Sequence, residues 1–208
     1  MYTPKPFRED RQEVLQAFIA RHPLGALVCV TDTGLTANHI PMQWSPREST
    51  PGALRGHVAR ANAIWQRLAP DADVLVIFSG GNRYISPSWY PGKAEHGKVV
   101  PTWNYAVVHA HGTIQFEPES QTEAHRNVTD LTNHLEIGRP NQWQVADAPA
   151  EYVDSLVRQI VPFQISIRCL TGKFKASQHR DESERRSVAI GLAGEGASAQ
   201  EIDEVVAK

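Results

Sequence analysis

The chain contains few cysteines and no long run of apolar residues. Its two cysteines, Cys29 and Cys169, lie in separate strand-like segments, which argues against a disulfide framework and predicts buried thiols in a reducing compartment. A membrane span needs about 18 consecutive apolar residues, and no segment approaches that length. The first ten residues also lack the apolar stretch of a secretion signal. We therefore expect a cytoplasmic protein that makes no membrane contact.

A strong excess of one charge is missing as well. Lys plus Arg number 21 and Asp plus Glu number 23, so the formal net charge is -2 at pH 7. Proteins that coat nucleic acids carry a strong basic field, which this chain as a whole lacks. Any contact with DNA is therefore expected to be local or to be made by a partner. The candidate is the segment 168–186, where six basic residues against three acidic ones leave a local charge of +3.

Motifs of several common enzyme classes are also absent. The sequence has no P-loop, no nucleophile elbow and no zinc-type cysteine spacing, which argues against NTPase, α/β-hydrolase and zinc-finger functions. His109 and His111 share one face of a predicted strand and could bind a metal if carboxylates joined them. The interpretation that we favour for this pair is a solvated or hydrogen-bonded sheet face.

The composition is otherwise that of a globular chain, with 41% hydrophobic and 21% charged residues. Alternating apolar and polar residues in 108–116 predict a long strand, and Asp32-Thr33-Gly34 between two apolar runs predicts a hairpin. Ser120 followed by Glu123 is a capping box that predicts a helix start. These rules predict strands at about residues 24–31, 35–43, 53–58, 74–78, 108–116 and 163–169, and helices at about 8–21, 64–68, 120–135, 148–160 and 198–206.

Such an element order predicts a mainly β fold with flanking helices (α+β), in which antiparallel strands close a barrel. Residues 1–170 are expected to form this barrel domain with its flanking helices. Residues 171–208 are expected to form a basic, partly helical C-terminal extension packed on or near the barrel. The segment 80–104 is dense in Gly, Pro, Ser and aromatic residues, which is unusual for a connector and indicates a function.

Two stretches within and just after this segment carry a specific signal. They read YISPSWYP at 84–91 and VPTWNY at 100–105, the latter running into VHAHG at 108–112. Together they closely resemble the PaiB-type FMN-binding negative transcriptional regulator family. The resemblance spans nearly the whole chain, because it extends to MYTP at 1–4, ANHIP at 37–41, GHVARAN at 56–62 and GKFKASQ at 172–178.

This resemblance implies an FMN-binding split β-barrel that assembles as a homodimer, with two flavin pockets at the subunit interface. Flavin mononucleotide needs cations and donors for its phosphate, polar groups at the ring rim and an apolar wall against the ring face. On this basis the candidate cofactor-binding residues are His57, Arg60, Asn62, Ser86, Ser88, Trp89, Trp103, Asn104, Lys175 and Gln178. No catalytic or metal-ligating residue is assigned.

Each kind of candidate has an expected role and a plainer alternative. Arg60 and Asn62 precede a predicted helix and are expected near the phosphate, which Lys175 and Gln178 would reach from the same or the other subunit. The serines would donate hydroxyls, the tryptophans would wall the ring, and His57 and Asn104 would meet its rim. The alternatives are a solvated arginine, a solvated basic turn and tryptophans that serve packing alone.

The sequence departs from the family pattern at His179. The family reads Ser-Gln-Asn-Arg where this chain reads Ser177-Gln178-His179-Arg180, so an asparagine contact is lost or replaced by imidazole. The function we favour is a PaiB-type FMN-binding repressor of transcription. The alternative is a flavin-dependent oxidoreductase that uses NAD(P)H, since the cofactor performs such chemistry and no catalytic side chain need be evident. A third hypothesis is a haem or metal sensor that uses His109 and His111.

Overall fold

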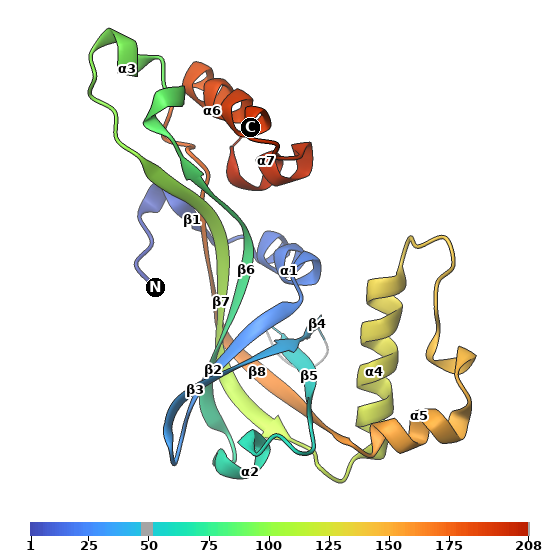
Figure 1. Ribbon diagram of the computed structural model, residues 1–208. Coiled ribbons are helices and arrows are strands. Elements are labelled where there is room, and N and C mark those ends of the chain that lie inside the picture. Colours follow the sequence, from blue (N-terminus) through green and yellow to red (C-terminus); the bar gives the residue numbers. More distant parts are fainter. Residues whose placement is uncertain (47–51, 208) are drawn as a thin grey trace. The chain divides into compact units, whose positions relative to one another are not determined.

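The computed structural model describes residues 1–46 and 52–207 (Figure 1). An eight-stranded sheet has the strand order β3-β2-β6-β7-β8-β5-β4, and β1 pairs with β8 outside this path. The pairs β1–β8, β2–β3, β4–β5 and β5–β8 are antiparallel. The strands are β1 Arg8–Glu9, β2 Leu24–Thr31, β3 Gly34–Pro41, β4 Gln43–Ser45, β5 Ala53–Ala59, β6 Ala72–Ile85, β7 Thr102–Phe116 and β8 Ile160–Lys175.

Two helices, α4 and α7, begin where the capping signals of the sequence predict. Ser120 accepts a hydrogen bond from the Glu123 backbone N–H, and Ser198 and Glu201 cap α7 reciprocally. Within the described chain, no helix is long and apolar enough to span a bilayer. The helices are α1 Gln12–Arg21, α2 Ile64–Arg67, α3 Gly92–Glu95, α4 Gln121–Glu136, α5 Ala150–Val157, α6 Glu182–Gly194 and α7 Ala199–Val205, with 3-10 turns η1 Lys5–Phe7, η2 Pro87–Trp89 and η3 Val145–Asp147.

Several elements differ from the sequence prediction. β6, β7 and β8 are all longer than predicted, because β7 begins at Thr102 and β8 runs from Ile160 to Lys175. β6 continues to Ile85, beyond its apolar run, because the pairing of neighbouring strands fixes its extent and local propensity does not. α1 begins at Gln12, because Arg8 and Glu9 pair with Lys173 and Gly172 of β8 and thereby form a strand.

Contacts divide the described chain into two compact units. Unit 1 comprises residues 1–18, 78–109 and 171–208, and unit 2 comprises 19–77 and 110–170, so β6, β7 and β8 pass from one to the other. Each unit has its own buried core. Unit 1 buries Ile85, Tyr90, Val188, Leu192, Val205 and Val206. The buried residues of unit 2 include Leu27, Leu54, Val76, Phe163 and Ile165. A domain boundary after residue 170 stays a prediction.

The cysteines differ from one another. Cys29 is 3% exposed and burial raises the pKa of its thiol, as expected for a buried thiol. Cys169 is exposed, so the prediction that it is buried is wrong. The reason is a shift in β8: buried side chains alternate through Ile167, and the inward face then resumes one position out of phase at Leu170.

Candidate functional site

The sequence-predicted residues fall into three groups, of which the first surrounds η2 in unit 1. Ser86 caps η2, since its Oγ accepts from the Ser88 backbone N–H at 3.2 Å. The carbonyl of Trp89 accepts from Ser187 Oγ of α6 at 2.5 Å. The Trp89 ring lies directly on α6, because a Cβ on Gly191 would come within 2.4 Å of it. The segment that carries the YISPSWYP motif is thus fixed against a helix about 100 residues later.

A pocket of about 410 Å³ lies at this junction, and we call it the serine–lysine pocket. The Nζ of Lys93 donates to Ser88 Oγ at 2.9 Å. A lysine ammonium beside hydroxyls is a donor set that suits a phosphate or another anion. Its lining consists of Ser88, Trp89, Tyr90, Pro91, Lys93, Ala94 and Ser187.

Sequence reasoning found Ser88 and Trp89 but missed Lys93 and Ser187. Lys93 lies five residues after Ser88, within the segment 80–104 that the sequence indicates to be functional. The sequence could therefore have pointed to it. Ser187 had no sequence signal, because only the packing of α6 on η2 brings it to the pocket.

The second group lies on β7, at the end of β8 and in the turn that follows β8, also in unit 1. Lys175 Nζ donates to Thr102 Oγ1 and, at 2.9 Å, to the Trp103 carbonyl, and burial lowers the pKa of Lys175. Gln178 accepts from the Ala176 N–H and donates to the Phe174 carbonyl. The polar atoms of both side chains are therefore already occupied by hydrogen bonds within the chain.

Asn104 is fully buried in the same group. Its Nδ2 donates to Ser177 Oγ at 2.8 Å and to the Val205 carbonyl at 2.9 Å. Its Oδ1 has no hydrogen-bond partner within the described chain. Trp103, in contrast, is half-exposed, and its Nε1 donates to Asn82 Oδ1 at 3.2 Å.

The family departure at His179 lies beside this group. The ring of His179 meets Phe7 edge-on with centroids 5.5 Å apart. Burial, together with the charges of Arg180 and Lys175, lowers the pKa of His179. Arg180 lies over the Tyr90 ring at 4.8 Å, so this turn contacts one wall of the serine–lysine pocket.

The third group, in unit 2, is made of His57, Arg60 and Asn62. The Arg60 guanidinium donates to three backbone carbonyls, those of Arg158, Pro118 and Ile160. Asn62 donates to Asn38 Oδ1 at 2.8 Å and accepts from the Ile64 N–H at the start of α2. Arg60 and Asn62 thus hold loops and a helix start together.

His57 borders a cavity of about 250 Å³ in unit 2. Its Nδ1 lies 2.7 Å from Asn127 Oδ1 on α4.

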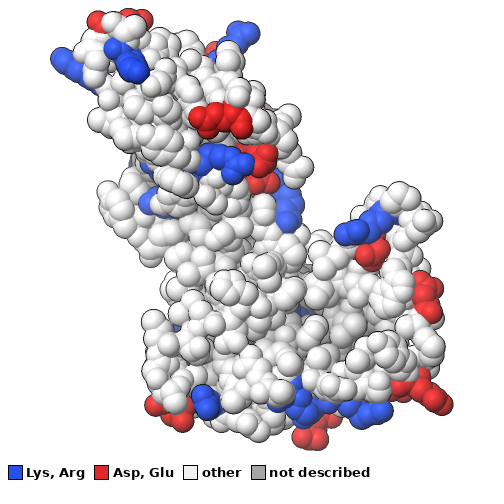
Figure 2. All heavy atoms as spheres, viewed as in Figure 1, with Lys and Arg blue, Asp and Glu red and all other residues white. Residues whose placement is uncertain are grey.

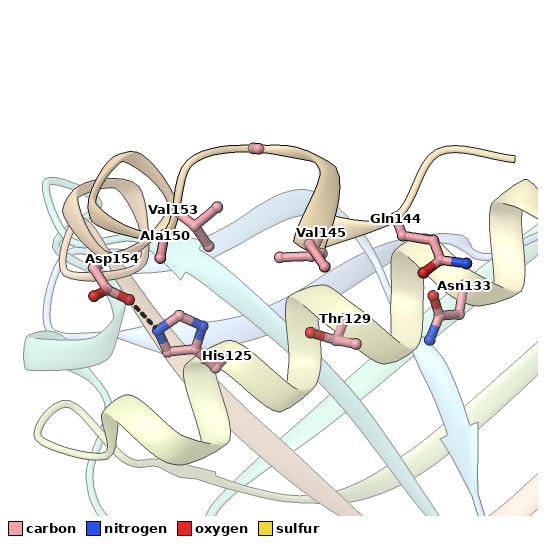
Figure 3. Close-up of a pocket in the computed structure, with 10 residues that line it drawn as sticks. His125, Thr129, Asn133, Gln144, Val145, Ala150, Val153 and Asp154 are labelled. Carbon is pink, nitrogen blue, oxygen red and sulfur yellow. Dashed lines mark ion pairs between the residues drawn. The ribbon is translucent and has the colours of Figure 1, made fainter.

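A further pocket of about 490 Å³ lies between α4 and the segment from Gln144 to Asp154 (Figure 3). Its one ion pair joins His125 Nε2 to Asp154 Oδ1 at 2.9 Å, and Thr129 and Asn133 follow His125 at four-residue spacing on α4. None of the sequence-predicted site residues lines this pocket.

The basic segment 168–186 carries less free charge than its composition indicates. Arg168 pairs with Asp73 at 2.8 Å and Arg180 with Glu184 at 3.2 Å, while Lys173 lies over the Tyr105 ring. On the face of the described residues that Figure 2 draws, basic and acidic side chains are interspersed. In the part of the chain that the structure describes, no group of three or more His, Cys, Asp and Glu could hold a metal ion.

Comparison with known proteins gives matches along nearly the whole chain. A model of the family described as "Putative FMN-binding domain" matches residues 1–169. An uncharacterized protein of Aspergillus fumigatus is 34% identical over 92% of this chain and 90% of its own length. The protease synthase and sporulation protein PAI 2 of Bacillus subtilis is 29% identical over 94% of this chain and 90% of its own length. The resemblance inferred from the motifs is thereby confirmed.

Solved structures match the fold at low sequence identity. The flavocytochrome Anf3 of Azotobacter vinelandii has a TM-score of 0.60 at 13% identity and covers 86% of this chain and 75% of its own. The FAD and heme binding protein of Mycobacterium smegmatis has a TM-score of 0.59 at 14% identity, over 88% of this chain and 80% of its own. These likenesses confirm the mainly antiparallel split-barrel fold with flanking helices.

Proposed function

Because this chain belongs to the FMN-binding domain family, we propose that it is a cytoplasmic, homodimeric regulator that uses bound FMN and represses transcription. Membership of this family indicates that the cofactor of the chain is FMN. The regulatory role is supported by the likeness to the Bacillus subtilis sporulation protein along 94% of the chain. It is also the role that the resemblance of the motifs implies.

The observation that carries the flavin assignment is the serine–lysine pocket. Its volume of about 410 Å³ lies within the range of about 300–1,000 Å³ that is usual for small-molecule sites. Lys93 would hold the phosphate by charge, and Ser88 would donate its hydroxyl to it. The partly exposed ring of Trp89 offers a flat surface for the ring system. The residues present therefore fit an FMN molecule.

Exposure of this pocket supports the dimer. Ser88 and Lys93 are exposed in the single chain, although a tightly held flavin buries most of its surface. A second copy of the chain would supply the missing wall. The remaining predicted contacts, including those of Trp103 and His57, stay predictions.

The test is a titration with FMN and with riboflavin, which lacks the phosphate. Lys93→Ala is expected to weaken FMN binding by about 10–100-fold, because a hydrogen bond to a charged group contributes about 1.5–3 kcal/mol. Riboflavin affinity should stay within about twofold, since riboflavin has no phosphate for Lys93 to hold. The matched control is Lys98→Ala, which removes an exposed lysine outside the pocket. Unchanged FMN affinity in Lys93→Ala, or an equal loss for riboflavin, would contradict the assignment.

Direct repression is tested separately on promoter DNA. The regulator should be retained at low salt and released as salt rises, and Lys173→Ala with Arg186→Ala should weaken retention. No retention at low salt would remove direct repression and leave action through a partner protein.

The alternative is a flavin-dependent oxidoreductase that uses NADH or NADPH, for which a bound FMN would supply the redox chemistry. This chain's residues would then bind the flavin and position it, with no protein acid or base required. Anaerobic mixing with each nicotinamide distinguishes the two functions: rapid bleaching of the flavin absorbance favours the oxidoreductase, and its absence favours the regulator. For the haem or metal sensor, the described residues add no third ligand of the His, Cys, Asp or Glu type to His109 and His111.

A further inference from the structure

The cavity beside His57 has the character of a ligand site of its own. It lies within unit 2, where α4, η3 and α5 meet His57 of β5, and its volume is about 250 Å³. We call it the aromatic pocket, after Trp143 and Tyr152 in its wall. Apolar side chains from α4, α5 and the start of β8 complete the wall, among them Val128, Leu156, Val157 and Ile160.

Much of this apolar surface faces water. Trp143 is 46% exposed, Tyr152 58% and Leu156 47%. Removing apolar surface from water is favourable by roughly 25 cal/mol per Å². Exposed large apolar side chains scattered singly are ordinary, but three that line one cavity give a ligand a surface to cover.

His57 gives the pocket its polar selectivity. The amide oxygen of Asn127 can only accept, so the 2.7 Å contact requires His57 Nδ1 to carry the proton and to donate it. The Asn127 side chain belongs to a buried residue of α4, which holds the imidazole in this tautomer. With its proton on Nδ1, the imidazole of His57 carries an acceptor lone pair on Nε2, and the described residues make no hydrogen bond to that atom.

The charge of the lining excludes several ligand classes. Among the described residues, no lysine or arginine lines the aromatic pocket, so it does not suit the phosphate of FMN, unlike the serine–lysine pocket. The neighbouring pocket of Figure 3 shares Val145, Ala148 and Val153 with it, but there His125 and Asp154 already bind one another. The aromatic pocket thus favours a neutral, apolar molecule with a single hydrogen-bond donor.

We propose that the aromatic pocket binds a small planar aromatic molecule of one or two rings whose N–H or O–H donates to His57 Nε2. The cavity is below the range of about 300–1,000 Å³ for drug-sized ligands, which limits the ligand to this size. This site is separate from the proposed flavin site and does not depend on it. It gives His57 a role other than the flavin rim expected from the sequence, and it provides a regulator with a place for an effector.

The decisive experiment compares indole with benzofuran, which has the same shape but no N–H donor. Binding to the wild-type protein is measured by calorimetry and by ligand-observed NMR. Indole is expected to bind about 3–10-fold more tightly, as one neutral hydrogen bond allows. His57→Phe should abolish this preference, whereas His57→Gln, which keeps an acceptor, should retain part of it. Equal affinity of the two probes for the wild type would overturn the proposal without need of any variant.

Two further arms locate the site. Trp143→Ala should weaken both probes, and Leu135→Ala, which removes an exposed apolar residue of α4 outside the pocket, should weaken neither. FMN affinity should be unchanged in Trp143→Ala. If FMN displaces indole competitively, or if Trp143→Ala weakens FMN and indole alike, the pocket belongs to the flavin and the separate site is disproved. Failure of Lys93→Ala to affect FMN would overturn the flavin assignment alone.

Discussion

The two candidate pockets are built from different kinds of contact. The serine–lysine pocket of unit 1 joins η2 and α3 to α6, which follows about 90 residues later, and it offers a cation and hydroxyls. The aromatic pocket of unit 2 joins consecutive elements, α4, η3 and α5, to one residue of β5, and it offers rings and a single imidazole. The comparison shows that the polar groups which decide what a site can bind are those that are exposed and make few hydrogen bonds within the chain. Lys175 and Gln178, in contrast, are engaged by their own chain.

The largest expected effect tests whether the two pockets depend on the same core. Leu192→Ala removes a buried side chain of α6 and is expected to lower the free energy of unfolding by about 2–5 kcal/mol. Because α6 carries Ser187, FMN affinity should fall, while indole affinity at the aromatic pocket should persist. Urea unfolding and the two titrations measure these outcomes. An equal loss of affinity for FMN and for indole would mean that Leu192→Ala disturbs both units alike.

Leu54→Ala is the matched variant, because Leu54 is buried in unit 2. A loss of stability of similar size is expected, now with the larger effect on indole. If FMN binding falls more than indole binding in this variant, the comparison between the units fails.

The two thiols report opening of unit 2 specifically, since both Cys29 and Cys169 lie in it. At neutral pH, Cys169 should react with a maleimide rapidly, because it is exposed. Cys29 should react at least about 100-fold more slowly, because it is buried and its raised pKa leaves less thiolate. Mass spectrometry of labelled peptides gives both rates. Labelling of Cys29 as fast as Cys169 would show that β2 is not protected.

The smallest effect concerns His179 of unit 1. Its pKa is lowered in the folded state, so below its ordinary value near 6.5 the unfolded chain binds more protons than the folded one. The free energy of unfolding should therefore fall as pH decreases from about 7.5 to 5, beyond the fall from other groups. His179→Asn, which restores the family residue, should flatten this part of the pH profile. A profile identical to that of the wild type would assign the dependence to other groups.

The sequence predicted those features whose cause is local. The turn signal Asp32-Thr33-Gly34 predicted the hairpin of β2 and β3, and capping residues located the starts of α4 and α7. Motif order identified the family, because short pieces in a fixed order carry information that composition does not. The site residues that the sequence could indicate, such as Ser88 and Trp89, belong to one continuous motif.

The contacts between segments that are far apart in the chain were decided by the tertiary structure alone. The phase shift that exposes Cys169, the packing that brings Ser187 to Lys93, and the bond that sets the tautomer of His57 all depend on residues far apart in the chain. Local propensity does not encode such contacts, because they arise from the competition of whole elements for one buried surface. The sequence thus determined the elements and the family, and packing determined which polar atoms remain available to a ligand.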